Sequence, residues 1–509
     1  MSAVLFVSAE SSSIKGAKVG GVADVVGDVS LALAALGKEV YVVLPHYQCL
    51  ELEEQTLCAQ VSVNFASCAL QLDVYRVLQK SGVTHYVISH PWLNSEQVYF
   101  DDTDGRPFAG DASKFALFSL AVAEAITSGV FGKLSVLHLH DWHAASLAVL
   151  RAYAPQYQQL QEISTVYTVH NLALQGTRPF SGDDSSLQHW FPWLGYDGQR
   201  ICDRHYAHCY NPMRAALQLC DKVHVVSPTY VEEVMRPSDH ERGFIGGEGL
   251  ELDLQQAHQQ GRLVGILNGC DYDKALPEYT MESLWQLSDR ALIQWISAKS
   301  QLQSNHYVAH LRAQQWQTQG LTPWLCSVGR ITNQKVALLG EHYQGKLVID
   351  HVLELLDKYD KTFVMLGSGD AHYEQLFNRA MGKHDNFLFY NGFALELGDA
   401  IYQQGELFFM PSSFEPCGIS QMLAMRSGTA CLVHGVGGLK DTVLDGDNGF
   451  VFGGSSIATQ IKEMLTKMDK ALAMYDNEPS EWQQLSKAAK GSRYTWQAAA
   501  KSYIAQLYS

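Results

Sequence analysis

Two glycine pairs, each followed by residues typical of a helix, are the first groups in this sequence whose spacing suggests chemistry. The segment Lys18-Val-Gly-Gly-Val-Ala-Asp-Val25 lies between an apolar run, Val4 to Val7, and a predicted helix from Asp24 to Ala35. Glycine lets backbone N–H groups approach a phosphate at a helix N-terminus, and Lys18 adds positive charge. A tight turn opening any α/β domain has the same composition. The second copy, Gly437-Gly438-Leu439-Lys440-Asp441-Thr442-Val443, favours phosphate binding and predicts two Rossmann-like halves.

A second candidate is the cluster His138-Leu-His-Asp-Trp-His143, which places three imidazoles and a carboxylate within six residues. Imidazole and carboxylate groups are common ligands of zinc. The order differs from the H-x-H-x-D-H pattern of dinuclear metallohydrolases, because Asp141 precedes Trp142 and His143. The cluster keeps a metallohydrolase as an alternative, which a metal assay on the purified protein would test.

The overall composition argues against several classes of protein. With 509 residues, 47% of them hydrophobic, the chain is long enough for two or more domains. A net charge of −16 argues against nucleic acid as a partner, because phosphate backbones bind basic surfaces. The ten cysteines include no C-x-x-C pair, which fits a reducing compartment. Without a signal-peptide pattern or 18 consecutive apolar residues, the protein is predicted to be soluble and cytoplasmic, with no membrane partner.

Short apolar runs alternate with helical stretches along the chain, which is typical of parallel sheets with crossover helices. The first series of predicted strands is Val4 to Val7, Val40 to Leu44, His85 to Ile88, Val136 to His140, Thr165 to Val169 and Lys222 to Val226. The second series is Leu325 to Val328, Thr362 to Leu366, Phe387 to Phe389, Leu407 to Met410 and Ala430 to Val433. The fold class is therefore α/β, with two doubly wound domains.

The predicted boundary between these domains falls near Gly265 to Asn268. We expect an N-terminal domain over residues 1–266, a C-terminal domain over 267–490, and a C-terminal helix within 491–509 that packs back on the N-terminal domain. The Gln-rich region from Leu284 to Gln319 is predicted to be helical. The tail is predicted to be an amphipathic helix because its apolar residues recur near helical spacing.

Seven motifs follow one another along the chain: Lys18-x-Gly-Gly-Val-Ala-Asp-Val, His140-Asp-Trp-His143, Thr168-Val-His-Asn171, Val226-Ser-Pro-Thr-Tyr230, Leu267-Asn-Gly269, Gly329-Arg-x-x-x-Gln-Lys335 and Pro411-Ser-Ser-Phe-Glu-Pro-Cys-Gly418. They stand in the order found in bacterial glycogen synthases and plant starch synthases, and the chain resembles that family over nearly its whole length. The resemblance implies the GT-B fold, two Rossmann-like domains facing across a deep cleft. It also implies retaining transfer of glucose from a nucleotide diphosphate sugar to the non-reducing end of an α-1,4-glucan.

Breaking a sugar–diphosphate bond leaves negative charge on two phosphates, so an acidic protein needs fixed cations there. Arg330 follows a predicted strand at its carboxyl end, where open α/β sheets place ligands. An isolated arginine or lysine is more often a solvated surface charge. In the family, the residues matching Arg330 and Lys335 grip the diphosphate in place of a metal, so the resemblance implies neither a metal nor another cofactor.

Three further residues complete the expected catalytic set with Arg330 and Lys335. A carboxylate at a strand end, such as Glu415, can accept hydrogen bonds from sugar hydroxyls, although an acid at a helix N-terminus is also favoured by the helix dipole. The resemblance places Glu415 near the 3-hydroxyl of the transferred glucose. It places Asp141 near the acceptor hydroxyl, and His170 near the 6-hydroxyl and anomeric centre.

The resemblance also implies residues that bind the two substrates. The expected donor-binding residues are Lys18, Gly20, Gly21, Asn171, Asn268, Phe393, Cys417, Gly418, Gly437 and Gly438. The expected acceptor-binding residues are Asp24, Tyr99 and His143. Stacking of Phe393 on a base accepts any base, so the resemblance to bacterial members is what favours ADP-glucose.

Several positions depart from the family pattern. The path to Lys18 is longer than usual and carries a second cation, Lys15; Val19 and Val336 replace small residues, and Ser413 replaces a basic one. These changes leave open a divergent glucosyltransferase that uses another nucleotide-glucose or a short or non-glucan acceptor. They also leave open a catalytically weak glucan-binding relative. The sequence leaves the oligomeric state open.

Overall fold

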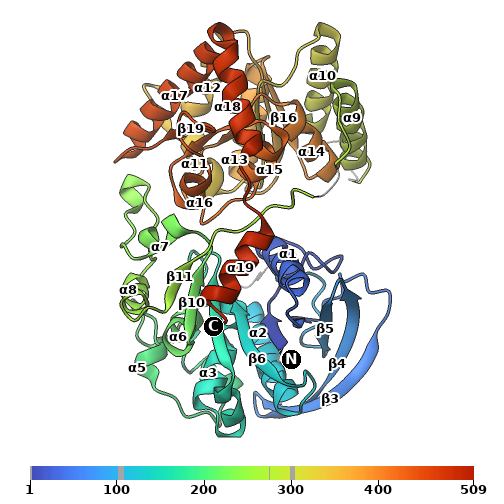
Figure 1. Ribbon diagram of the computed structural model, residues 1–509, viewed down its shortest axis with the longest axis vertical. Helices are drawn as coiled ribbons and strands as arrows, with labels where there is room; N and C mark the ends of the chain where they lie inside the picture. Colours follow the sequence, from blue (N-terminus) through green and yellow to red (C-terminus); the bar gives the residue numbers. More distant parts are fainter. Residues whose placement is uncertain (1–2, 101–107, 274–275, 299–303) are drawn as a thin grey trace. The chain divides into compact units, whose positions relative to one another are not determined.

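A computed structural model describes residues 3–100, 108–273, 276–298 and 304–509 of the chain. The chain divides into two compact units (Figure 1). The N-terminal unit comprises Met1–Ser238, Gly246–Gly269 and Thr495–Ser509, and the C-terminal unit comprises Asp239–Ile245 and Cys270–Tyr494. Each unit is built around a mainly parallel sheet with helices on both faces.

Within its described residues, the N-terminal unit contains a nine-stranded sheet in the order β11-β10-β7-β6-β1-β2-β5-β4-β3. All neighbouring pairs from β11 to β5 are parallel, and β3 and β4 add an antiparallel hairpin at one edge. The strands are β1 (Ala3–Val7), β2 (Val40–Pro45), β3 (Thr56–Phe65), β4 (Cys68–Lys80), β5 (Val83–Ser89), β6 (Leu134–His140), β7 (Ser164–Val169), β10 (Lys222–Val225) and β11 (Leu263–Gly265).

The C-terminal unit contains, in its described part, a six-stranded parallel sheet in the order β16-β15-β12-β17-β18-β19. The strands are β12 (Leu325–Val328), β15 (Phe363–Gly367), β16 (Phe387–Asn391), β17 (Leu407–Met410), β18 (Ala430–His434) and β19 (Gly449–Phe452). Their side chains are almost all buried, as expected for parallel strands covered on both faces. Short two-stranded pairs lie outside both sheets: β8 (Arg178–Pro179) with β9 (Cys209–Tyr210), and β13 (His342–Tyr343) with β14 (Lys346–Leu347).

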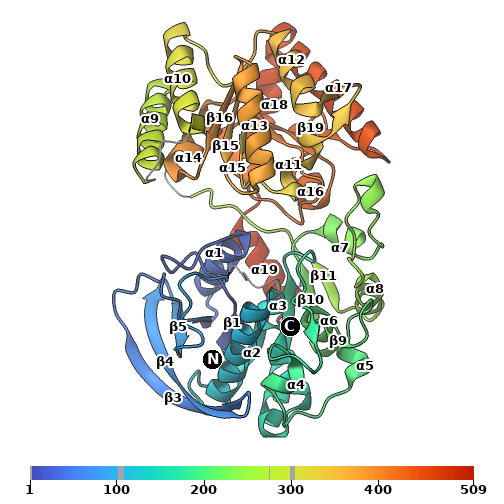
Figure 2. The same cartoon turned by 180° about the vertical axis from the view of Figure 1, so that it is seen from behind.

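Helices cover both faces of each sheet. In the N-terminal unit, α1 and α19 lie on one face and α2 and α3 on the other (Figures 1 and 2). The helices of this unit are α1 (Gly21–Ala35), α2 (Ala109–Thr127), α3 (Asp141–Tyr153), α4 (Leu187–Trp190), α5 (Gly198–Ile201), α6 (Pro212–Leu219), α7 (Pro228–Val234), α8 (Glu251–Gln259) and α19 (Trp496–Gln506). Those of the C-terminal unit are α9 (Met281–Ser297), α10 (Ser304–Gln319), α11 (Asn333–Gly340), α12 (Val348–Asp357), α13 (Ala371–Lys383), α14 (Leu395–Gln404), α15 (Ser420–Ser427), α16 (Gly437–Thr442), α17 (Ile457–Asn477) and α18 (Pro479–Gly491).

The strand order fixes where ligands can reach each sheet. In both units the chain starts in the middle of the sheet, adds strands toward one edge and then returns to add strands on the other side. The reversal lies between β1 and β6 in the first sheet and between β12 and β17 in the second. Ligands of open α/β sheets bind outside the carboxyl ends of the strands at such a switch point. A ligand site is therefore expected at the turns that follow β1, β6, β12 and β17.

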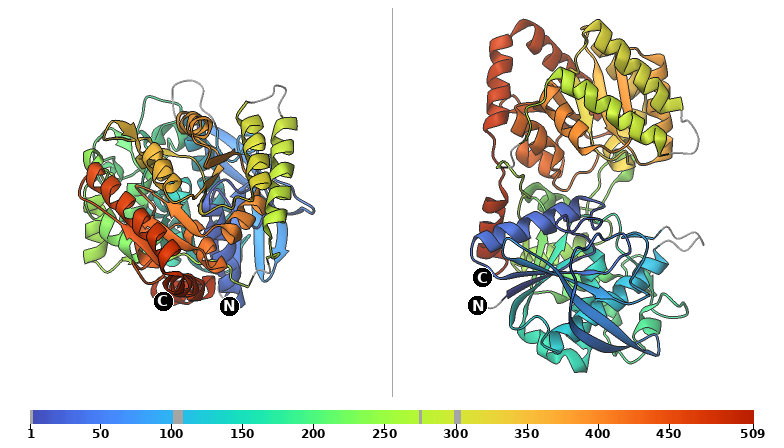
Figure 3. Two further views of the ribbon diagram at one scale, coloured as in Figure 1. Left: turned by 90° about the horizontal axis from the view of Figure 1, so that it is seen from above. Right: turned by 90° about the vertical axis from the view of Figure 1, so that its right-hand side faces the viewer.

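The last helix belongs to the N-terminal unit although it follows the whole C-terminal unit in the sequence. Helix α19 contacts α1, and Figure 3 shows the two side by side. Its approach requires a glycine, because a Cβ atom on Gly269 would lie 2.3 Å from the backbone nitrogen of Trp496. This contact explains one glycine of the motif Leu267-Asn-Gly269 by packing alone.

The strands predicted from apolar runs are all present, and the α/β fold class is confirmed. Several features differ from the predictions. The hairpin β3–β4, the short strands β11 and β19 and the pairs β8–β9 and β13–β14 were not predicted, and the region from Leu284 to Gln319 contains two helices, α9 and α10. Helix α1 begins at Gly21, three residues before the predicted start.

Two further observations concern the environment of the chain. Within the described ranges, no helix has the combination of length and apolar composition that a membrane span requires. All ten cysteines are free thiols, and five of them are buried.

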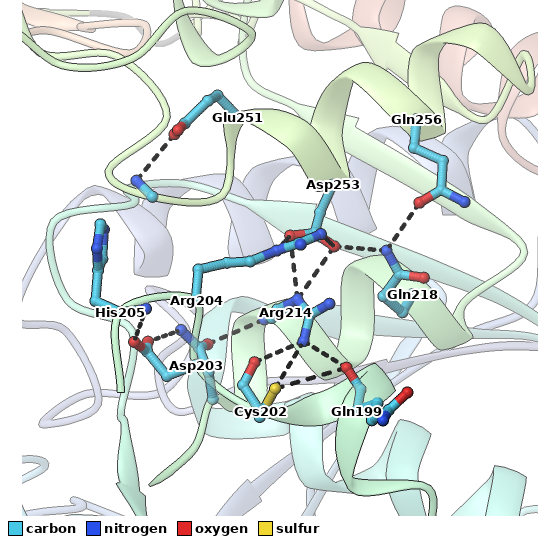
Figure 4. A network of polar contacts seen from close by, with 12 residues as sticks. Gln199, Cys202, Asp203, Arg204, His205, Arg214, Gln218, Glu251, Asp253 and Gln256 are labelled. Carbon is cyan, nitrogen blue, oxygen red and sulfur yellow. Dashed lines mark hydrogen bonds and ion pairs between the residues drawn. The ribbon is translucent and has the colours of Figure 1, made fainter. Parts of the chain in front are cut away.

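A buried ion-pair network fixes the segment between α5 and α6 to helix α8 (Figure 4). The fully buried carboxylate of Asp253 accepts hydrogen bonds from Arg204 at 2.8 and 2.9 Å and from Arg214 at 3.2 Å. The amide of Gln218 adds a third donor at 2.6 Å. Arg214 also donates to the carbonyl oxygens of Gln199 and Cys202. One carboxylate therefore holds two helices and a loop together.

We expect Asp253→Ala to lower the free energy of unfolding by about 3–5 kcal/mol, because it leaves the buried Arg214 guanidinium without its counter-charge. Denaturant unfolding measures this change. Glu354→Ala is the matched control, since it removes an exposed ion pair with Lys346 and is expected to cost about 0–1 kcal/mol. Similar values for the two variants would contradict a structural role of the network.

Candidate active site

The glycine-rich loop after β1 is held by a carboxylate that the sequence analysis did not single out. One oxygen of the buried Glu10 accepts hydrogen bonds from the backbone N–H groups of Val19, at 2.8 Å, and Gly20, at 2.6 Å. Gly20 is the N-cap of α1. The Gly20 N–H is therefore engaged by Glu10, and this bond fixes the backbone between Lys18 and α1, so that Lys18 is the group of this loop left to contact a phosphate. Glu10 lies three residues after the end of β1. Arg330 was predicted to be functional because it follows the carboxyl end of a strand, and the same argument would have identified Glu10.

Lys18 and Asp24, which were assigned to different substrates, form an ion pair with each other. The Lys18 Nζ lies 2.7 Å from Asp24 Oδ1, and the two side chains are 49% and 30% exposed. An ion pair this exposed is weak, so a ligand phosphate can compete for Lys18 at little cost. Lys15, the rival cation, pairs instead with Glu51, and both of those side chains are largely exposed.

Tyr99 contacts Glu10, which holds the glycine loop, and also the histidine cluster. Its hydroxyl donates to the second oxygen of Glu10 at 2.6 Å, and its ring centroid lies 5.2 Å from that of His143. Burial and the nearby Glu10 carboxylate raise the pKa of Tyr99 well above its usual value, so the hydroxyl keeps its proton. The tyrosine predicted on the acceptor side is therefore linked through Glu10 to the loop predicted on the donor side.

Asp141 and His170 are brought together at the ends of the adjacent strands β6 and β7. Asp141 is the first residue of α3 and has a left-handed backbone, with φ of 52°. Its Oδ1 accepts a hydrogen bond from the backbone N–H of His170 at 2.8 Å. Burial raises the pKa of Asp141 to about 7, although hydrogen bonds from the backbone of His170 and Asn171 oppose the shift. A carboxyl group that titrates near neutrality is suited to a reaction centre.

The histidines of the cluster are engaged with protein partners rather than directed at one point. The ring nitrogens of His138 contact the Tyr508 hydroxyl at 2.7 Å and the Thr168 hydroxyl at 2.6 Å. His140 Nδ1 lies 2.9 Å from His170 Nε2, and the His138 and His140 rings are stacked. In the part of the chain that the structure describes, no three His, Cys, Asp or Glu residues are arranged to hold a metal ion. These contacts oppose the metallohydrolase interpretation.

The C-terminal unit brings together Lys335 and Glu415. Lys335 lies in the first turn of α11, and Glu415 lies between β17 and α15. Their Nζ and Oε2 atoms are 3.0 Å apart, and the side chains are only 24% and 11% exposed. Arg330 follows β12 with an exposed side chain. A cation and a carboxylate thus meet where the strand order reverses, which is where a charged sugar donor is expected to bind.

The second glycine pair packs against the Glu415 segment. A Cβ atom on Gly437 would lie 2.0 Å from the Glu415 carbonyl oxygen, and that of Gly438 would lie 2.3 Å from the Cys417 carbonyl oxygen. The Gly438 N–H donates to the Glu415 carbonyl oxygen at 3.2 Å. These glycines are explained by close backbone packing, which also positions Glu415. Cys417 is buried, and Gly418 has a φ of 74°.

Three further residues were predicted to bind the donor: Asn268, Asn171 and Phe393. Asn268 is buried, and its Oδ1 has no hydrogen-bond partner among the described residues, as expected of an acceptor that awaits a ligand hydroxyl. Asn171 Oδ1 accepts from the backbone of Ala173. Phe393 is 76% exposed, in the loop after β16. Lys18 and Arg330 belong to different units, and their convergence on one ligand stays a prediction.

The buried histidines predict a loss of stability at acid pH. Burial lowers the folded-state pKa of His143 and His170 to about 3 and of His224 to about 4, and those of His138 and His140 well below 6.5. As the pH falls below about 6.5, these histidines bind protons in the unfolded chain but not in the folded chain. The free energy of unfolding therefore falls by up to about 1.4 kcal/mol per histidine and pH unit. Asp141, with its raised pKa, opposes this loss between about pH 7 and 4.

Denaturant unfolding from pH 7.5 to 5 measures the slope. His224→Gln is expected to reduce it, and His208→Gln, at an exposed position, is the control. A stability that is constant over this range would show that the histidines are not held neutral.

Comparison with known proteins identifies the family of this chain. The starch synthase catalytic domain profile matches residues 3–256, and the glycosyl transferases group 1 profile matches residues 322–467. The chain is 33% identical to a glycogen synthase of Exiguobacterium sibiricum over 96% of this chain and 95% of that protein. It is 32% identical to a glycogen synthase of Streptococcus pneumoniae over 98% of both.

Two solved structures share the fold. The catalytic domain of starch synthase IV from Arabidopsis thaliana, bound to ADP and acarbose, matches with a TM-score of 0.76 and 25% identity over 99% of this chain and 98% of that one. Sucrose-phosphate synthase from Thermosynechococcus elongatus matches with a TM-score of 0.55 and 16% identity over 100% and 98% of the two chains. Together with the Rossmann-like order of both sheets, these matches show that the chain belongs to the glycogen synthase and starch synthase family of GT-B glycosyltransferases.

Proposed function

We propose that this protein is a glycogen synthase that transfers glucose from ADP-glucose to the non-reducing end of an α-1,4-glucan with retention. The bond between glucose C1 and the diphosphate oxygen breaks, a bond from C1 to the acceptor hydroxyl oxygen forms, and ADP and a proton are released. The observation that carries the proposal is the Lys335–Glu415 pair at 3.0 Å, at the switch point of the C-terminal sheet. The full-length likeness to glycogen synthases and the ADP and acarbose of the starch synthase IV structure support it.

The basic residues are assigned to the leaving diphosphate. Lys335 is already held in place by Glu415, so it needs no reorganisation when charge develops. Arg330 is exposed and close in sequence to Lys335, and Lys18 has only a weak exposed partner. In this proposal the three cations supply the electrostatic stabilisation that a divalent metal provides in other transferases.

The carboxylates and imidazoles are assigned to the sugars. One oxygen of the Glu415 carboxylate pairs with Lys335, and the carboxylate is assigned to accept hydrogen bonds from hydroxyls of the transferred glucose. The buried side-chain oxygen of Asn268 is a further acceptor. His170 stays neutral at pH 7, so it can donate or accept a hydrogen bond without adding charge near the anomeric carbon. Asp141 lies beside His170 and is assigned to the acceptor hydroxyl.

We expect the purified protein to release ADP from ADP-glucose when a maltooligosaccharide is present, and to use UDP-glucose and GDP-glucose less well. Lys335→Ala and Arg330→Ala should each lower turnover about 100-fold to 1000-fold, the usual effect of losing a preorganised charge partner. Lys346→Ala, which removes an exposed ion pair of the same unit, is the control and should be fully active.

The same assay separates the alternatives. Turnover of another nucleotide-glucose, or transfer only to a short or non-glucan acceptor, would indicate a divergent glucosyltransferase. Binding of maltooligosaccharide without turnover of any donor would indicate a glucan-binding relative. Near-normal turnover in both alanine variants would contradict the assignment of the cations.

Catalysis is expected to need no divalent metal, because the cations neutralise the leaving group. Incubation with EDTA followed by the ADP-release assay should leave the rate nearly unchanged. A loss of activity that zinc or manganese restores, with about one or two metal ions per chain by elemental analysis, would move the catalytic centre to the histidine cluster.

A further inference from the structure

The Glu10 carboxylate joins two segments that are predicted to bind different substrates. Its Oε1 accepts from the Tyr99 hydroxyl at 2.6 Å, and its Oε2 accepts from the backbone N–H groups of Val19 and Gly20. Glu10 is only 2% exposed. Its backbone is fixed as well, because its N–H donates to the Ser8 hydroxyl and its carbonyl accepts from that hydroxyl. Both oxygens of a buried, fixed carboxylate are thus committed to these two segments.

The backbone around Tyr99 is clamped by helix α2. Lys114 Nζ donates to the Val98 carbonyl oxygen at 2.7 Å, and Asp111 accepts from the Phe100 N–H at 3.1 Å. Lys114 and Asp111 form an ion pair of 2.6 Å in which both side chains are at most 3% exposed. The residues on either side of Tyr99 are therefore held by one buried ion pair. As a result, the Tyr99 hydroxyl meets Glu10 from a fixed position.

The other end of this chain of contacts is the start of helix α1. Gly20 is the N-cap of α1, and the two N–H bonds to Glu10 hold the backbone of Val19 and Gly20, directly after Lys18. A carboxylate that loses its Tyr99 partner is held through Oε2 alone, so it positions the loop less firmly. A less ordered loop must be ordered when a ligand binds, which lowers affinity.

We propose that Glu10 is a positioning residue through which the Tyr99 hydroxyl orders the donor-phosphate loop Lys18–Gly21. The inference rests on the proposed function, since it takes Tyr99 as an acceptor contact and the loop as a donor contact. It predicts that a change confined to the acceptor side weakens binding of the nucleotide sugar.

Tyr99→Phe tests this directly, because it keeps the aromatic ring for the acceptor and removes only the hydroxyl. The KM for ADP-glucose and the calorimetric Kd for ADP should both rise about 10-fold or more, the effect of losing a hydrogen bond to a charged group. The KM for maltooligosaccharide should change by less than about 2-fold, because ring stacking persists. Glu10→Gln should raise the donor KM in the same way, and the double variant should be no worse than the more severe single variant.

Tyr157→Phe is the matched control, because it removes a buried tyrosine hydroxyl that donates to a glutamate, Glu124, at 3.1 Å, elsewhere in the same unit. It should leave both KM values unchanged. Thermal unfolding of each variant confirms folding, and Glu10→Gln carries the test if Tyr99→Phe is unstable. If the wild type is active but the folded variants have an unchanged KM for ADP-glucose, the coupling is wrong. The same follows if the KM increases of Tyr99→Phe and Glu10→Gln add in the double variant. Either result would leave the proposed function standing. A wild type without donor turnover or ADP binding would overturn the proposed function itself.

Discussion

The hydrogen bond from the His170 backbone to Asp141 is the interaction on which the candidate site of the N-terminal unit depends. It joins the ends of two neighbouring strands and holds Asp141 with a φ of 52°, a conformation that costs a non-glycine residue about 1–3 kcal/mol. Packing of the surrounding residues must offset that cost. Most of the neighbours of Asp141 and His170 in the sequence are buried and therefore contribute to this packing. The Asp141 carboxylate is buried, and burial raises its pKa to about 7.

The imidazoles behind this bond are a consequence of the same burial. Neutral histidines can stack and bond to one another, as His138, His140 and His170 do, whereas charged ones would repel. The partners come from distant parts of the chain, since Tyr508 lies 370 residues after His138. The C-terminal segment thereby packs against the histidines next to the candidate reaction centre. This contact gives a physical reason why the segment belongs to the N-terminal unit.

Much of the fold could be predicted from local patterns, but the connections within the site could not. Buried parallel strands are continuous apolar runs, so β1, β6, β12 and β17 were visible in the sequence. Hairpin β3–β4 was not, because its exposed face interrupts the apolar pattern with polar residues. The spacing of His138 to His143 suggested a metal because local spacing does not show that Thr168 and Tyr508 occupy the imidazoles. Glu10 is not part of any of the motifs recognised in the sequence. Its role becomes apparent only from the folded structure, in which Tyr99 and Gly20 donate hydrogen bonds to it.

The two candidate phosphate-binding lysines differ in a way that burial explains. Lys18 and Asp24 are paired in water, where an exchange of one anion for another costs little. Lys335 and Glu415 are mostly out of water, and separating them would leave a buried charge without a partner. Under the proposed function, a phosphate group that binds Lys18 has to displace Asp24, whereas one that binds Lys335 has to be accommodated beside Glu415. The position of Lys335 is thus set within its own unit before any ligand binds, while Lys18 can follow the ligand. In a chain with a net charge of −16, an exposed and weakly paired lysine also helps to attract an anionic ligand.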